Sequence, residues 1–302
     1  MAQSILILGG GELGTAILEG LASHPSRGDT KIAVLLRQSS LDSAAPEKRR
    51  LTQHIRALGG SLEAADVVAA PATELASLFG AYDTVICCTG MGLPAGTQTK
   101  IARAVLDAGV ARFVPWQFGM DYDAIGEGSS QDLFDEQLAV RKILRAQEGT
   151  RWTIVSTGVF MSFLFEPAFG VVDLGARTAR GLGSWETRIT ATTPGDIGRV
   201  TAEVVLDPRE LGEGSGVVYT AGETVSYGEL ADRVDAHFGE RFKRELWDGE
   251  ALRKQMEEDP NPMVKYRDTF GQGIGVAWEM ERTLNYQRGM AMTDVKAFLK
   301  SM

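Results

Sequence analysis

The chain has 302 residues, of which 44% are hydrophobic and 24% charged, and its 31 basic and 40 acidic side chains give a formal net charge of −9. This balance is typical of a globular protein with a sizeable core, and it excludes the disordered and collagen-like classes. A broad nucleic-acid surface is not expected, because such a surface needs an excess of basic groups. The sequence contains no run of about 18 apolar residues, the length that a transmembrane helix needs, so no membrane association is expected.

The two cysteines, Cys87 and Cys88, are neighbours in an apolar run. Adjacent residues of a strand point to opposite faces, so a disulfide between these two would be strained. Neither they nor the three scattered histidines have the spacing of metal ligands, and no metal is expected. The N-terminal residues MAQSILILGGG lack a basic segment and lead directly into a strand, which argues against a signal peptide. These features predict a reducing, cytoplasmic location.

Strand and helix patterns alternate through the first half of the chain. Short apolar runs predict buried parallel strands at residues 4–8, 31–36, 66–69, 84–88, 112–115 and 152–156. Helical patterns lie between them, at residues 13–21, 46–58, 72–79, 98–108 and 132–147. Strands that alternate with helices of this length form βαβ units, so this half predicts a parallel sheet.

The pattern changes after about residue 157, where aromatic residues and glycines crowd together. Further elements are predicted as helices at residues 195–206, 226–238 and 293–302 and a strand at residues 217–219. We therefore expect an α/β fold: a doubly wound parallel Rossmann sheet in residues 1–156 and a smaller C-terminal α/β region in residues 157–302. The second region is expected to bind mainly substrate, with some segments packing back on the Rossmann sheet.

A glycine cluster follows the first strand and satisfies the pattern G-x-G-x-x-G. Gly9 allows a tight turn, Gly11 has no side chain to block a pyrophosphate, and Gly14 lets the helix pack closely on the strand. Glu12 and Leu13 begin the helix, whose free N–H groups and positive dipole end suit phosphates. The pattern predicts a dinucleotide site at Gly9, Gly11, Glu12, Leu13 and Gly14; a purely structural glycine turn is the alternative.

The residue that ends the second strand separates NAD from NADP. An acidic residue at this position would bind the ribose 2′-hydroxyl, but the chain has Arg37, and Lys48 follows in the next helix. A guanidinium suits a 2′-phosphate, so the sequence predicts NADPH. The alternative for the basic run at residues 48–50 is a solvated helix face.

The segment Arg112 to Asp123, RFVPWQFGMDYD, is similar to the motif R-F-x-P-S-E-F-G-x-D-x-D. This motif belongs to the NmrA-like and isoflavone reductase-like group of atypical short-chain dehydrogenases/reductases, which includes phenylcoumaran benzylic ether and pinoresinol-lariciresinol reductases. Other matching segments are VICCTG ending at Gly90, WTIVSTGVF from Trp152, and SYGEL from Ser226. The chain resembles this group over most of its length, and Arg37 and Lys48 fall on its 2′-phosphate positions.

The resemblance implies a Rossmann domain, a smaller substrate domain, and NADPH with its nicotinamide near the F-G-x-D segment. It places four residues beside the cofactor, namely Thr89, Gly90, Gln117 and Phe118. It places five others near a substrate cleft, namely Met120, Tyr122, Phe160, Met161 and Phe163. For these apolar and aromatic residues, ordinary core packing is the alternative.

One departure from the resemblance concerns the catalytic group. The reductases carry a general acid/base lysine in the segment F-x-x-K-x-x-I-R-R, and this chain has Gln137 at the lysine position. Glutamine donates hydrogen bonds but carries no titratable proton at physiological pH. No tyrosine of the chain has a lysine four residues later, so the Tyr-x-x-x-Lys arrangement is absent from the sequence as well.

Three interpretations of this departure remain open. In the first, the protein is still an NADPH-dependent reductase of a small aromatic substrate, with Gln137 or Tyr122 orienting the substrate and Tyr122 or water supplying the proton. In the second, it is a non-catalytic NADP(H) sensor that binds a regulatory partner. In the third, it catalyses a redox-neutral or other reaction in the same pocket. The aromatic residues between positions 116 and 169 favour an enzyme with a small-molecule substrate. We expect the protein to be a monomer or a homodimer.

Overall fold

A computed structural model describes residues 3–208 and 215–302. The chain forms two compact units, each interrupted in sequence. The first contains Met1–Gln117, Ala139–Val155 and Ile197–Val218. The second contains Phe118–Leu138, Ser156–Asp196 and Tyr219–Met302. The segment after the fifth strand thus belongs to the second unit, and residues 197–218 belong to the first. Within the described ranges, no helix is long and apolar enough to cross a membrane.

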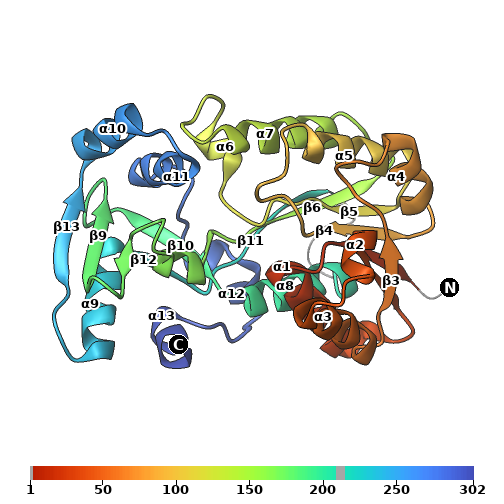
Figure 1. Cartoon of the computed structure of the whole chain (residues 1–302), viewed down its shortest axis with the longest axis horizontal. Coiled ribbons are helices and arrows are strands. Elements are labelled where there is room, and N and C mark those ends of the chain that lie inside the picture. Colours follow the sequence, from red (N-terminus) through yellow and green to blue (C-terminus); the bar gives the residue numbers. More distant parts are fainter. Residues whose placement is uncertain (1–2, 209–214) are drawn as a thin grey trace. The chain divides into compact units, whose positions relative to one another are not determined.

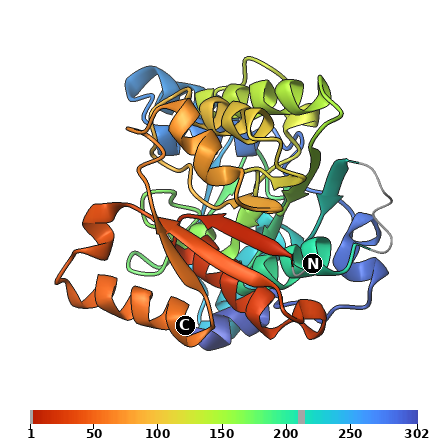
Figure 2. The ribbon, with the colours of Figure 1, turned by 90° about the vertical axis from the view of Figure 1, so that its right-hand side faces the viewer.

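A seven-stranded sheet forms the centre of the first unit, with the order β11-β6-β5-β4-β1-β2-β3. Its strands are β1 (Ser4–Leu8), β2 (Lys31–Leu36), β3 (Ser61–Ala64), β4 (Thr84–Cys87), β5 (Arg112–Val114), β6 (Arg151–Ser156) and β11 (Gly216–Tyr219). Strand β1 pairs in parallel with both β2 and β4, and Figure 2 shows β1 and β2 between layers of helices. The predicted doubly wound Rossmann sheet is confirmed.

Helices cover both faces of this sheet (Figure 1). On one side lie α1 (Glu12–Ser23), α3 (Pro46–Ala57) and α8 (Pro194–Leu206), and on the other lie α4 (Ala72–Phe79) and α5 (Thr97–Asp107). The backbones of α1 and α8 approach closely, because a Cβ atom added at Gly20 would lie 2.3 Å from the carbonyl oxygen of Gly198. Two shorter helices, α2 (Gln38–Leu41) and the 3-10 helix η1 (Pro25–Arg27), complete this part.

The third strand is the element that the apolar pattern placed wrongly. It was expected at residues 66–69, but β3 occupies Ser61–Ala64. Gly59 and Gly60 end the preceding helix, and the chain enters the sheet directly after them, so that Ala33 pairs with Ser61. Asp66 instead begins a turn, in which its Oδ1 accepts hydrogen bonds from the amides of Val68 and Ala69. Local side-chain bonding of this kind competes with strand pairing.

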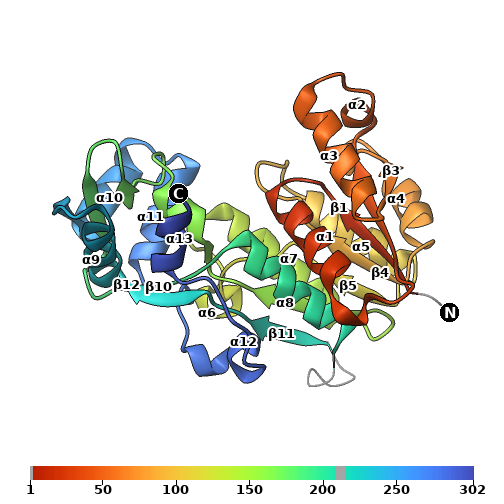
Figure 3. The same cartoon turned by 90° about the horizontal axis from the view of Figure 1, so that it is seen from below.

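Two three-stranded sheets organise the second unit. One has the order β12-β10-β7, with β7 (Val159–Phe160), β10 (Arg188–Thr192) and β12 (Glu223–Ser226), and Figure 3 shows β10 beside β12. The other has the order β13-β9-β8, with β8 (Val172–Asp173), β9 (Thr178–Leu182) and β13 (Lys243–Trp247). The helices are α6 (Tyr122–Ile125), η2 (Met161–Phe165), α9 (Tyr227–Phe238), α10 (Gly249–Glu258), α11 (Pro262–Gly271), η3 (Met280–Arg282), α12 (Leu284–Gln287) and α13 (Val295–Ser301). Helix α7 (Asp132–Arg145) contributes residues to both units.

Tyr227 carries a buried hydroxyl at the start of α9. Its side chain is 1% exposed, and its hydroxyl has no hydrogen-bond partner among the residues that the structure describes. A buried polar atom without a partner costs desolvation free energy, so Tyr227→Phe is expected to raise the free energy of unfolding by about 1 kcal/mol. Urea unfolding followed by circular dichroism measures this change.

Tyr219→Phe is the matched control, because the Tyr219 hydroxyl donates to Asp121 Oδ2 over 2.6 Å. Its loss is expected to lower the free energy of unfolding by about 1 kcal/mol. A loss of the same size in Tyr227→Phe would mean that a bound water satisfies the Tyr227 hydroxyl, and would contradict the prediction.

Candidate functional site

The glycines of the loop between β1 and α1 have different structural roles. Gly9 has φ +99°, a conformation that favours glycine. A Cβ atom added at Gly14 would lie 2.0 Å from the carbonyl oxygen of Gly9, so α1 can pack on the loop only without a side chain there. Gly11 is exposed and has extended backbone, and an added Cβ atom would meet no atom within 4 Å. Gly9 and Gly14 therefore shape the loop, whereas Gly11 leaves an open space in front of it.

The open space at Gly11 lies at the N-terminus of α1. Gly11 is the N-cap residue and provides no side-chain hydrogen bond to the first turn. The first N–H groups of this helix are therefore available to donate hydrogen bonds to a phosphate in this space. Glu12 is exposed at the first helical position, whereas Leu13 is 5% exposed and packs in the core. The buried Leu13 side chain consequently fixes the end of the glycine loop to the core.

Two leucines that pack on the glycine loop have basic residues near them in sequence. A Cβ atom added at Gly10 would lie 2.9 Å from Leu36 Cδ2 and 3.2 Å from Leu51 Cδ2. Arg37 directly follows Leu36, and Lys48 is one helical turn before Leu51 on the same face of α3. Neither basic side chain forms a hydrogen bond or ion pair with any residue that the structure describes. Arg37 also lies near Asp66, whose pKa is lowered first by its hydrogen bonds from the Val68 and Ala69 amides and further by the positive charge of Arg37.

Thr89 and Gly90 follow β4, next to the loop of β1. A Cβ atom added at Gly9 would lie 3.1 Å from Thr89 Cβ, so the two predicted residues Gly9 and Thr89 are in contact. The Thr89 carbonyl accepts hydrogen bonds from Gln98 Nε2 over 2.8 Å and from Cys87 Sγ over 3.4 Å. Gln98, at the start of α5, thus fixes the backbone at the carboxyl end of β4.

Gln117, after β5, is held by a buried arginine. Arg141 on α7 is 0% exposed, and its Nε donates to Gln117 Oε1 over 2.7 Å. The Gln117 side chain is itself 1% exposed and therefore anchors the loop from inside the first unit. Arg141 was not among the predicted site residues. It lies three residues after Leu138 and three before Leu144 on the buried face of the helix, and it also coincides with the first arginine of the motif F-x-x-K-x-x-I-R-R; these were its two sequence indications.

The cysteine thiols are buried and poorly suited to nucleophilic chemistry. Cys87 is 0% exposed and Cys88 is 8% exposed. Burial raises the pKa of the Cys87 thiol to about 12, and it raises the pKa of Cys88 as well. The thiolate is the reactive form, so both groups are inert at neutral pH in the folded protein. The described residues also hold no group of three His, Cys, Asp or Glu that could ligate a metal.

In the second unit, Tyr122 and Gln137 are both buried around Phe134. The Tyr122 and Phe134 ring centroids are 4.9 Å apart, and Gln137 follows Phe134 by three residues on the same face of α7. Gln137 is 1% exposed and Tyr122 is 7% exposed. The Tyr122 hydroxyl lies against Gly119, because a Cβ atom added there would be 2.3 Å from the hydroxyl oxygen. A glycine is therefore needed at position 119 for this tyrosine to lie where it does.

The remaining predicted residues of this unit differ in burial. Three of them, Phe118, Met120 and Met161, are buried, and Met161 is 0% exposed. Burial of the two methionines fits the core alternative for these side chains. Phe160 and Phe163 are partly exposed.

Tyr266 on α11 is an aromatic residue that the motifs did not indicate. The ring centroid of Phe163 lies 5.7 Å from that of Tyr266. Tyr266 also meets Phe134 in an edge-to-face contact, with centroids 5.8 Å apart. Burial raises the pKa of the Tyr266 hydroxyl, and the neighbouring Tyr122 raises it further. No motif segment includes Tyr266, so it could not be predicted as a site residue.

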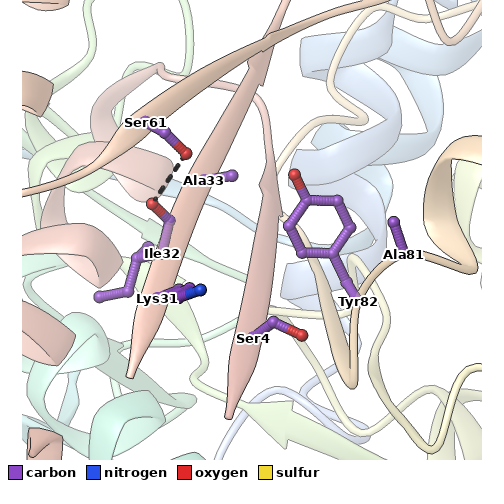
Figure 4. Close-up of a pocket in the computed structure, with 7 residues that line it drawn as sticks. All are labelled: Ser4, Lys31, Ile32, Ala33, Ser61, Ala81 and Tyr82. Carbon is purple, nitrogen blue, oxygen red and sulfur yellow. Dashed lines mark hydrogen bonds between the residues drawn. The ribbon is translucent and has the colours of Figure 1, made fainter. Parts of the chain in front are cut away.

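A surface pocket lies at the opposite, amino-terminal edge of the large sheet (Figure 4). It is lined by Ser4, Lys31, Ile32, Ala33, Ser61, Ala81 and Tyr82, which surround the first residues of β1, β2 and β3. The Tyr82 hydroxyl beside it donates to Glu63 Oε1 over 2.7 Å. The pocket lies at the amino ends of these strands, whereas the glycine loop follows the carboxyl end of β1, so the two are separate.

Comparisons with known proteins show similarity over nearly the whole chain. The NmrA-like family matches residues 1–299 of the chain. An NmrA-like family domain-containing oxidoreductase of Gibberella moniliformis is 57% identical over 303 residues, covering 100% of this chain and 99% of that protein. Phenylcoumaran benzylic ether reductase Betv6 of Betula pendula is 28% identical over 97% of this chain and 95% of its own length.

Solved structures share the fold. A crystal structure of isoflavone reductase has a TM-score of 0.80 at 21% identity, covering 100% of this chain and 99% of that one. The leucoanthocyanidin reductase–NADPH complex of Vitis vinifera has a TM-score of 0.79 at 16% identity, with 99% and 98% coverage. The match over nearly the whole sequence and the shared architecture lead to one conclusion: this chain belongs to the NmrA-like family.

Proposed function

We propose that this protein is an NADPH-dependent oxidoreductase that reduces a small aromatic carbonyl, enone, ether or imine by hydride transfer. The observation that carries the proposal is the open space at Gly11, which lies at the N-terminus of α1 where no side chain caps the helix. Gly10 and Gly14, on either side of it, have no room for a Cβ atom. Such a site fits a pyrophosphate, which approaches the backbone closely and accepts hydrogen bonds from free N–H groups.

The basic residues beside the loop support NADPH over NADH. Arg37 directly follows Leu36 and Lys48 precedes Leu51 by one helical turn, and both leucines pack on Gly10. The guanidinium of Arg37 would form charge-assisted hydrogen bonds with a ribose 2′-phosphate, and Lys48 would add a second positive charge. The relatives support the reaction class: the Gibberella protein is described as an oxidoreductase and the Betula protein as a reductase.

The protein residues have binding and orienting roles in this proposal. NADPH, when bound, supplies the hydride. Gly11 and the first turn of α1 bind the pyrophosphate, and Gln98 fixes the Thr89 backbone beside it. The Gln137 amide donates a hydrogen bond that orients the polar atom of the substrate, while Tyr122 or water supplies the proton.

A non-catalytic NADP(H) sensor that binds a regulatory partner is the second candidate. The observation that favours it is Gln137, a buried amide at the position where the reductase motif has lysine. An amide cannot transfer a proton at physiological pH, so the site can bind the cofactor and lack the step that completes a reduction.

Cofactor binding and turnover distinguish the two candidates. NADPH oxidation is measured with aromatic ketones, aldehydes, enones and imines, and an enzyme is expected to turn over at least one of them. Saturable NADPH binding without turnover on any of them would favour the sensor. Gln137→Lys tests the position directly: we expect its pH–rate profile to acquire an ionisation that the wild type lacks. If turnover and pH profile are unchanged, position 137 takes no part in proton transfer.

A further inference from the structure

We propose that Trp116 forms an aromatic wall for the nicotinamide half of the bound dinucleotide, and so acts as a further binding residue of the site. This inference rests on the proposed function, because it needs NADPH to bind the glycine loop. Trp116 was not among the predicted site residues, and it stands where the family motif quoted above has serine.

The indole of Trp116 lies flat against the end of the neighbouring strand. A Cβ atom added at Gly90 would lie 2.0 Å from Trp116 Cε3, 2.1 Å from Cδ2 and 2.5 Å from Cζ3. Three atoms of the six-membered ring therefore cover the Cα atom of Gly90. Glycine at position 90 is explained by this contact, without any approach of the cofactor. The indole is partly exposed, so part of its surface remains available to a ligand.

The backbone around Trp116 is held on both sides. Pro115 is buried, and the amide of Gln117 donates to the Pro115 carbonyl over 2.8 Å, which makes Trp116 the centre of a three-residue turn. The Gln117 side chain is in turn fixed by the fully buried Arg141. A side chain presented from such a backbone loses little conformational entropy when a ligand stacks on it.

The position of Trp116 in the sheet indicates which half of the dinucleotide it meets. Strand order reverses between β1 and β4, and a dinucleotide binds across the carboxyl ends at this point. Arg37 follows β2, on one side of the reversal, and is suited to the 2′-phosphate of the adenosine half. Gly90 and Trp116 follow β4 and β5, on the other side. The nicotinamide half extends in that direction, towards the indole.

Stacking on an indole has both an energetic and an optical consequence. Offset stacking of two rings contributes about 0.5–1.5 kcal/mol, which corresponds to a 2- to 10-fold change in the dissociation constant. Tryptophan emission overlaps the absorption of reduced nicotinamide, so a stacked pair transfers excitation energy efficiently. This transfer acts through space beyond contact distance, so it reports that the indole lies near the nicotinamide, and the loss of affinity in variants of position 116 is the readout that requires stacking.

The experiment titrates the wild type, Trp116→Phe and Trp116→Leu with NADPH, recording tryptophan emission and sensitised NADPH emission. Trp116→Phe is expected to lose the largest share of the energy transfer and to bind NADPH about 2-fold more weakly. Trp116→Leu is expected to bind up to 10-fold more weakly, because it has no ring. Trp152→Phe is the matched control, since Trp152 is a buried tryptophan of the same unit on β6, and it is expected to retain most of the transfer.

The outcomes separate this inference from the proposed function. If the wild type binds NADPH and both Trp116 variants keep its affinity, the aromatic wall is disproved while the cofactor assignment stands. If the wild type does not bind NADPH, both are overturned. Thermal unfolding of each variant identifies loss of fold, and if Trp116→Leu does not fold, the expected 2-fold loss in Trp116→Phe, whose ring preserves the packing on Gly90, decides.

Discussion

Gly11→Ala is expected to leave the protein folded and to weaken NADPH binding by at least about 100-fold. The added methyl group meets no atom of the protein within 4 Å, and the backbone at this residue has φ −75°, which alanine adopts without strain. The same methyl group would occupy the space that a pyrophosphate needs for close approach to the backbone. Fluorescence or calorimetric titration with NADPH measures the loss, and thermal unfolding verifies the fold.

Two other glycines provide controls for this substitution. Gly14→Ala would place a methyl group 2.0 Å from the Gly9 carbonyl oxygen, so it is expected to lower the free energy of unfolding by about 1–3 kcal/mol or more. Gly195→Ala also adds a methyl group in open space, near the start of α8, and is expected to raise the free energy of unfolding by up to about 1 kcal/mol and to leave binding unchanged. If Gly11→Ala binds NADPH as tightly as Gly195→Ala does, the pyrophosphate does not lie against Gly11.

The parts of the fold that depend on local pattern could be predicted from the sequence. Strands β1, β2 and β4 are short apolar runs bounded by turn residues, and each was placed within one residue of its observed bounds. Strand β3 has the sequence SLEA, with no fully buried residue, and it lies at the edge of the sheet. Its position depends on where Gly59 and Gly60 end α3, and the nearby apolar run after Asp66 gave a stronger but misleading pattern.

The parts of the candidate site that depend on contacts distant in sequence could not be predicted. The glycine loop is continuous, so its pattern alone indicated the roles of Gly9, Gly11 and Gly14. The contact of Trp116 with Gly90 and the hydrogen bond from Arg141 to Gln117 instead join residues on different elements. A motif shows that a glycine or a glutamine is present, but only the packed structure shows which side chain requires it.

Arg37→Ala is expected to convert a protein that prefers NADPH into one that hardly distinguishes NADPH from NADH. Hydrogen bonds to charged groups contribute about 1.5–3 kcal/mol, so NADPH binding should weaken by about 10- to 100-fold. NADH lacks the 2′-phosphate, and its affinity should remain unchanged. The wild type should also lose NADPH affinity as salt is added, and the variant should show a smaller dependence, because an exposed ion pair is screened.

Arg56→Ala is the matched control for this substitution, because Arg56 is an exposed arginine in the last turn of α3 and lies away from the glycine loop. It is expected to preserve the affinity for both dinucleotides. Lys48→Ala should reduce NADPH affinity less than Arg37→Ala does, since an ammonium group lacks the paired donors of a guanidinium. If Arg37→Ala lowers the affinities for NADPH and NADH equally, the arginine contacts a part of the dinucleotide that both molecules share, other than the 2′-phosphate. An unchanged NADPH affinity would remove Arg37 from the site, and the 2′-phosphate would then have to be bound elsewhere along the ends of β2 and β3.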